Sequence, residues 1–142
     1  CQQVAARTLN EPPETWTAHR ESLAARRTWA TDRLNAVGLT VEPGGTGHFL
    51  WANVTRLNLT GRQVADRLLA EYKVILGPGE LFGPSGKDFV RVSVAADDGR
   101  VREGLARVAA FAAKVSGKPE VASARVRMDA AVEERAPAFS RA

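Results

Sequence analysis

The sequence has little of what marks a secreted or membrane-bound protein. Its 142 residues include one cysteine, Cys1, so an internal disulfide framework is excluded and a reducing compartment is indicated. No apolar run approaches the roughly 20 residues that a membrane-spanning helix needs, and the first residues lack the basic and then apolar pattern of a signal peptide. We therefore expect a cytoplasmic protein without a membrane partner.

Charge of one sign is not concentrated in any segment. The 20 basic and 16 acidic residues give a net charge of +4, but the two signs alternate, as in RESLAARR and DDGRVREG. Such interleaving is typical of solvated helix surfaces and argues against a nucleic-acid partner. His19 and His48 have no partner at metal-ligand spacing, so we expect no metal site. Cys1 lacks the histidine or cysteine context of a catalytic thiol.

Apolar residues recur at helical spacing in three segments. A stripe from the proline pair of NEPPETW to Gly38 predicts a helix of about six turns, in which we interpret Trp16 and Trp29 as packing residues. Residues 60–72 begin with a capping box, and residues 97–115 have the clearest helical period. The expected inward residues are Trp16, Leu23, Ala30, Leu34 and Val37, then Val64, Ala65, Leu68, Leu69 and Tyr72, then Val101, Leu105, Val108, Ala112 and Val115.

Two other segments alternate in the manner of strands. Residues 48–54 place Phe49 and Trp51 on one face, and residues 88–95 place Arg91 on a face opposite to three valines. Residues 73–76, KVIL, predict a short buried strand. The order of elements predicts an α+β fold, in which helices cover one face of a small, mostly antiparallel sheet.

The glycine-rich loop before the second alternating strand, LGPGELFGPSGK, superficially resembles a phosphate-binding P-loop. That motif needs a glycine five residues before the Gly86–Lys87 pair, a Ser or Thr after the lysine, and a following helix. Here these positions hold Leu81 and Asp88, and a strand follows. The sequence therefore excludes a P-loop.

The loop instead delivers a strand in which Arg91 stands among valines. A buried guanidinium is costly without an anionic partner, and its planar fork suits a carboxylate. A solvated arginine, or one paired with a structural acid, is an equally good interpretation of the residues alone.

The segments GHFLWANV and VADRLLAEYKVILGPGELFGPSGKDFVRVSVAADDGRVREGLARVAAF resemble the C-terminal part of class I/II aminotransferases, the fold type I enzymes that use pyridoxal phosphate. The resemblance covers roughly residues 2–115. Its most specific part is the spacing of Pro78, Gly79, Phe82, Gly83, Gly86, Arg91 and Ser93.

This resemblance implies that Arg91 binds the α-carboxylate of an amino-acid or 2-oxo-acid substrate and that Phe49 borders the substrate pocket. It also implies a helical lead-in over residues 1–38, the small domain over residues 39–117, and a weakly patterned tail over residues 118–142. The chain begins with CQQVAARTL rather than methionine, so we expect a piece of a larger enzyme.

The resemblance further implies that the cofactor, pyridoxal 5'-phosphate, is bound by a large domain upstream of these residues. That domain also carries the lysine that holds the cofactor, and none of the lysines at positions 73, 87, 114 and 118 has the corresponding context. We therefore expect no catalytic residue in this chain and no activity from it alone. The resemblance also implies a homodimer when the enzyme is complete. The alternative is a stand-alone, non-catalytic α+β module that binds a small carboxylate or a protein partner.

Overall fold

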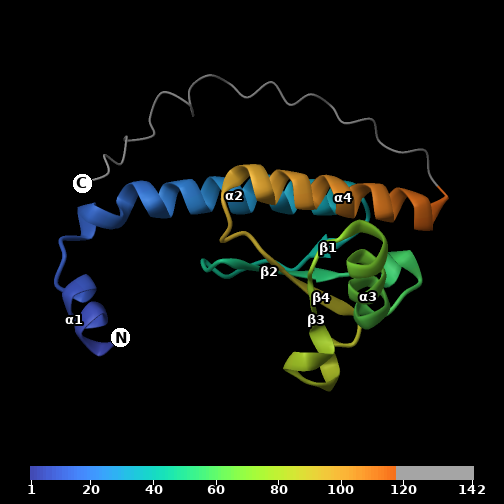
Figure 1. The fold of residues 1–142 in the computed structure, drawn as a ribbon, viewed down its shortest axis with the longest axis horizontal. Coiled ribbons are helices and arrows are strands. Elements are labelled where there is room, and N and C mark those ends of the chain that lie inside the picture. The colour runs from blue at the N-terminus through green and yellow to red at the C-terminus, as the bar shows by residue number, and fades with distance from the viewer. Residues whose placement is uncertain (118–142) are drawn as a thin grey trace.

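The computed structural model describes residues 1–117, which form a four-stranded antiparallel sheet and helices packed against it (Figure 1). The strand order is β1-β2-β4-β3. The strands are β1 (Thr40–Val41), β2 (Phe49–Asn53), β3 (Gly77–Pro78) and β4 (Phe89–Ser93). The predicted α+β fold with an antiparallel sheet is confirmed, while the predicted tail of residues 118–142 lies outside the described residues.

The long helices form a layer over one face of the sheet. Helices α2 (Thr17–Ala36) and α4 (Asp98–Ser116) pack against each other, and α3 (Gly61–Tyr72) lies at the end of the sheet near β3 and β4 (Figure 1). Helix α1 (Gln2–Leu9) stands apart and buries none of its residues. No helix within residues 1–117 is both long and apolar enough to cross a membrane.

The core lies between this helical layer and the sheet. Alternate residues of β2 and β4 point into it, so the period of two in the sequence correctly predicts which strand faces are buried. The helices contribute their apolar stripes to the same core, where a fully buried side chain of this kind stabilises the fold by about 1.5–3 kcal/mol. The largest members are Phe111, Leu34, Leu39, Leu68, Val54, Val64, Val90, Val94 and Val108.

The ends of α3 and α4 follow the capping signals in the sequence. The Thr60 hydroxyl accepts a hydrogen bond from the Gln63 backbone N–H at 3.3 Å, and the Gln63 side chain accepts one from the Thr60 N–H at 2.9 Å. Asp97 caps α4 by accepting a hydrogen bond from the Arg100 N–H, and Gly117 ends that helix with a φ of 61°. These caps satisfy backbone groups that a helix end would otherwise leave unpaired.

The structure corrects three of the expectations. Residues 73–76 are not a buried strand, because Lys73 ends α3 with a φ of 57° and the chain pairs with β4 only from Gly77 onward. Within that segment Ile75 is 81% exposed. Leu69, on α3, is 50% exposed and faces solvent, and Trp16 is 39% exposed and lies outside the core. Trp29 packs against the core as predicted.

Candidate functional site

The face of the sheet opposite the helices is open, and Arg91 lies near its centre. In the sheet register Arg91 is opposite Trp51 of β2 on one side and Gly77 of β3 on the other. Its neighbours along β4, Val90 and Val92, point into the core, so Arg91 must project from the open face, where it is half-buried. The site is therefore built around one guanidinium on an uncovered sheet surface.

The glycine-rich loop folds back on itself between β3 and β4. It consists of two short 3₁₀ turns, Gly79–Phe82 and Pro84–Gly86. Their backbones approach so closely that a Cβ on Gly86 would lie 2.1 Å from the Gly79 carbonyl oxygen, and a Cβ on Gly79 would lie 2.3 Å from that of Gly86. The loop glycines thus permit backbone contact within the loop, as glycine alone can.

This loop places Phe82 over the open face. The Phe82 ring meets the Trp51 ring edge-on, with centroids 5.6 Å apart, and Trp51 in turn stacks on Phe89 at 5.5 Å. Edge-to-face and offset stacked rings at these distances are favourable arrangements. A small aromatic cluster from β2, β4 and the loop therefore lies on the same open face as Arg91.

Two rings contact the Arg91 guanidinium directly. Its central carbon lies 4.1 Å from the centroid of the Phe49 ring and 4.4 Å from that of Phe82. The structure thus brings together the two site residues predicted from the sequence, Arg91 and Phe49. It adds Phe82, whose position in the loop motif was visible in the sequence although its contact with Arg91 was not.

Within residues 1–117, no carboxylate lies within ion-pairing distance of Arg91 and its guanidinium makes no hydrogen bond. Pairing with a structural acid, which the sequence left open, is therefore not observed among these residues. A guanidinium held by its faces keeps its N–H fork available, and that fork binds carboxylates through two parallel hydrogen bonds.

The start of β2 is anchored from the helical layer by Arg27. Its guanidinium donates hydrogen bonds to the carbonyl oxygens of Gly47 at 2.6 Å, Phe49 at 2.7 Å and Gly44 at 3.0 Å. These bonds fix the loop before β2 and the backbone of Phe49. In the sequence this helix shows only alternating acidic and basic residues, and nothing there predicts that Arg27 anchors the loop before β2.

The lysines within residues 1–117 are exposed to solvent, and two of them donate hydrogen bonds to oxygen acceptors. The Lys73 ammonium donates to the Ala70 carbonyl oxygen at 2.9 Å, and Lys87 is exposed. Lys114 donates to Glu71, and this hydrogen bond raises the pKa of Lys114 above its ordinary value. A nucleophilic lysine needs the opposite shift, since only the neutral amine attacks a carbonyl.

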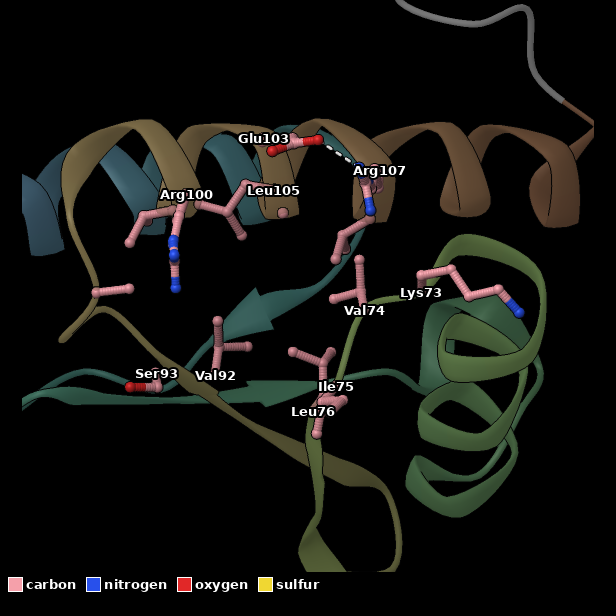
Figure 2. A pocket seen from close by; sticks show the side chains of 14 residues that line it. Lys73, Val74, Ile75, Leu76, Val92, Ser93, Arg100, Glu103, Leu105 and Arg107 are labelled. Atoms are coloured by element: carbon pink, nitrogen blue, oxygen red, sulfur yellow. Dashed lines mark hydrogen bonds and ion pairs between the residues drawn. The ribbon is translucent and has the colours of Figure 1, made fainter.

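Two further features lie away from Arg91. A cavity of about 250 Å³ opens between residues 73–76, the end of β4 and α4, with Val92 on its sheet side and Leu105 on its helix side (Figure 2). Arg100 points into it from α4, while Arg107 at its edge pairs with Glu103. On another surface the rings of His19 and His48 lie 6.4 Å apart. Across residues 1–117 no group of three metal-ligating side chains occurs.

Comparison with known proteins gives one consistent result. The family model of aminotransferase class I and II matches residues 1–108. The aspartate aminotransferase of Pyrococcus abyssi is 32% identical over 111 residues, covering 75% of this chain and 28% of that protein. The apo structure of BacF from Bacillus subtilis has a TM-score of 0.64 at 29% identity, covering 75% of this chain and 28% of that one.

A PLP-bound structure from Clostridium difficile 630 is similar in the same region. Its TM-score is 0.61 at 26% identity, covering 67% of this chain and 25% of that one. The chain spans about a quarter of the length of the curated relatives that it matches.

Proposed function

The chain belongs to the class I and II aminotransferase family, and we propose that it forms the part of an aminotransferase that binds the α-carboxylate of the substrate through Arg91. The observation that carries the proposal is the Arg91 guanidinium on the open sheet face, with two aromatic rings against it and no acid partner within residues 1–117. We assign residues 39–117 to the small domain of the enzyme and residues 1–38 to its helical lead-in.

Arg91 acts by positioning. Two parallel N–H···O bonds from one guanidinium fix both the place and the orientation of a carboxylate. With the carboxylate fixed, the amino group and the Cα–H bond of an amino acid take a defined direction, which lowers the entropic part of the barrier. The small domain closes over the substrate, excludes water from the site and completes the contact with Arg91.

The family depends on pyridoxal 5'-phosphate, which supplies an electron sink at the substrate Cα when bound. The described residues do not fit this cofactor, because the lysines among them are exposed or already bonded to acid or carbonyl oxygens. We therefore assign the cofactor and its lysine to the remaining part of the enzyme. This chain alone is then inactive, and the complete enzyme is a homodimer acting on an amino acid and a 2-oxo acid.

The proposal is tested by Arg91→Lys in the complete enzyme. Lysine keeps the charge but cannot form two parallel hydrogen bonds to a carboxylate. The transition state should therefore lose about 1.5–3 kcal/mol of stabilisation, so kcat/KM for the amino donor should fall roughly 10- to 150-fold. Arg102→Lys is the matched control, since Arg102 stacks on Trp29 of the helical layer, 4.6 Å from its centroid. Kinetics of Arg91→Lys equal to those of this control would refute the proposed role.

A further inference from the structure

We propose that Phe49 and Phe82 are positioning residues for Arg91: together they form an aromatic clamp that orients the guanidinium without occupying its N–H donors. The inference rests on the proposed function, because it assigns to the two rings the task of presenting Arg91 to a carboxylate. The rings come from different elements, since Phe49 begins β2 and Phe82 ends the first 3₁₀ turn of the loop.

Other arginines of the same chain are held in two ways: Arg102 stacks on the ring of Trp29, whereas Arg26 and Arg27 are held through their N–H donors. Arg26 donates hydrogen bonds to the carbonyl oxygens of Val94 and Ala96, at 3.0 and 2.7 Å, and pairs with Asp98. Arg27 donates three hydrogen bonds to carbonyl oxygens. Both use their N–H donors to tie elements together, whereas Arg91 is held through ring contacts alone among the described residues.

A cation–π contact suits a binding arginine because it acts through the face of the guanidinium. The attraction comes from the ring quadrupole and leaves the in-plane N–H groups available. Rings against the guanidinium also displace water from its faces, so that an anion at its edge meets a less solvated charge. An acid partner would hold the side chain equally well but would compete with the substrate carboxylate.

Each ring is itself supported. Phe82 packs edge-on against Trp51, and the backbone of Phe49 is fixed by Arg27. Gly77 lies next to both partners, since a Cβ there would make ordinary van der Waals contact with Arg91 Cβ at 3.5 Å and Phe82 Cε2 at 3.7 Å. The clamp is therefore a built arrangement. Its two rings are still 49% and 52% exposed, so their removal leaves no core cavity.

The test uses Phe82→Ala, Phe49→Ala and Phe82→Tyr in the complete enzyme. Each alanine variant should raise KM for the amino donor, and the inhibition constant of the monocarboxylate 3-phenylpropionate, by roughly tenfold. We expect KM to rise by more than kcat falls, because the contact with the carboxylate already forms in the bound substrate. Phe82→Tyr keeps the ring and should restore both constants.

Leu81→Ala is the matched control, because Leu81 is 66% exposed in the same 3₁₀ turn and has no ring that could form a cation–π contact. An unchanged inhibition constant in both alanine variants would overturn the clamp, as would a loss of kcat that Phe82→Tyr fails to restore. If Arg91→Lys impairs the enzyme while the alanine variants do not, the clamp is refuted but the proposed function is not. If Arg91→Lys itself has no effect, both the clamp and the proposed function are refuted.

Discussion

Gly61 begins α3 directly against the backbone of Phe89. Its N–H donates to the Lys87 carbonyl oxygen at 2.8 Å, and a Cβ added to Gly61 would lie 1.9 Å from the Phe89 carbonyl oxygen. Neither atom can move freely, because one belongs to a helix start and the other to β4. This contact fixes α3 against the strand that carries Arg91.

We predict that Gly61→Ala destabilises the chain by about 3 kcal/mol or more, at the upper end of the usual cost of overpacking. Gly104→Ala is the control within α4, where an added Cβ meets nothing within 4 Å. It should stabilise the chain by about 0.5–1 kcal/mol, because alanine loses less conformational entropy than glycine in a helix. Urea unfolding measures both free energies, and equal values for the two variants would contradict the packing described.

The capping box of α3 gives a second prediction. Thr60→Ala removes the hydroxyl that accepts the Gln63 N–H and should lower the free energy of unfolding by about 1 kcal/mol. Thr60→Ser keeps the acceptor and should retain most of the wild-type stability. A serine variant as unstable as the alanine variant would show that the methyl group, and not the cap, is responsible.

Arg27 joins α2 to the loop before β2 through three carbonyl oxygens. Arg27→Ala should lower the free energy of unfolding by about 1.5–3 kcal/mol, the range for hydrogen bonds to a charged group. Arg20→Ala is the control on the same helix, because among residues 1–117 its guanidinium donates a hydrogen bond only to the exposed Thr17 hydroxyl. Thermal melting compares the two, and equal melting temperatures would mean that the loop does not depend on Arg27.

Glu71 links α3 to α4 by accepting hydrogen bonds from Lys114 and Arg67, each at 3.0 Å. Lys114 first and then Arg67 hold the pKa of Glu71 below its ordinary 4.5. A carboxyl group whose pKa is lower in the folded chain than in the unfolded chain stabilises the fold when the pH is above its unfolded-state pKa. This stabilisation is lost as the pH falls through its folded-state pKa. The melting-temperature advantage of wild type over Glu71→Gln should therefore be present at pH 7 and vanish in acid.

The magnitude of this effect should be small and should decrease with salt, since the groups are exposed. Asp32→Asn is the control, because Asp32 forms no ion pair within residues 1–117. If wild type still melts at a higher temperature than Glu71→Gln, by the same margin, at a pH below the folded-state pKa of Glu71, then packing and not charge links these helices.

The regular elements were predictable because periodicity reports which side of an element is buried. The alternation around Arg91 and the stripe of α4 both predicted the observed faces correctly. The prediction for residues 73–76 was wrong because a lysine followed by three apolar residues can also form an extended connection. Lys73 adopts a left-handed conformation there, which no local pattern marks in a residue other than glycine or asparagine.

The two-residue strand β1 was missed, since Thr40 and Val41 are too short a pattern to distinguish from a turn. Arg91 and Phe49 could be named from the sequence, but the contact of Phe82 with Arg91 could not. Phe82 reaches the open face only through the fold of the loop, whose path depends on the close backbone approach of Gly79 and Gly86. Contacts of this kind depend on tertiary structure.

The contact between Arg91 and a carboxylate is central to the proposed function. The most direct measurement compares kcat/KM of the complete enzyme for an amino acid and for its α-carboxamide, in wild type, Arg91→Gln and the control Arg102→Gln. A neutral amide cannot form the charged bidentate pair, so wild type and control should have a higher kcat/KM for the acid than for the amide. In Arg91→Gln this acid-to-amide ratio should be at least about tenfold smaller. An acid-to-amide preference unchanged in Arg91→Gln would show that another group binds the carboxylate.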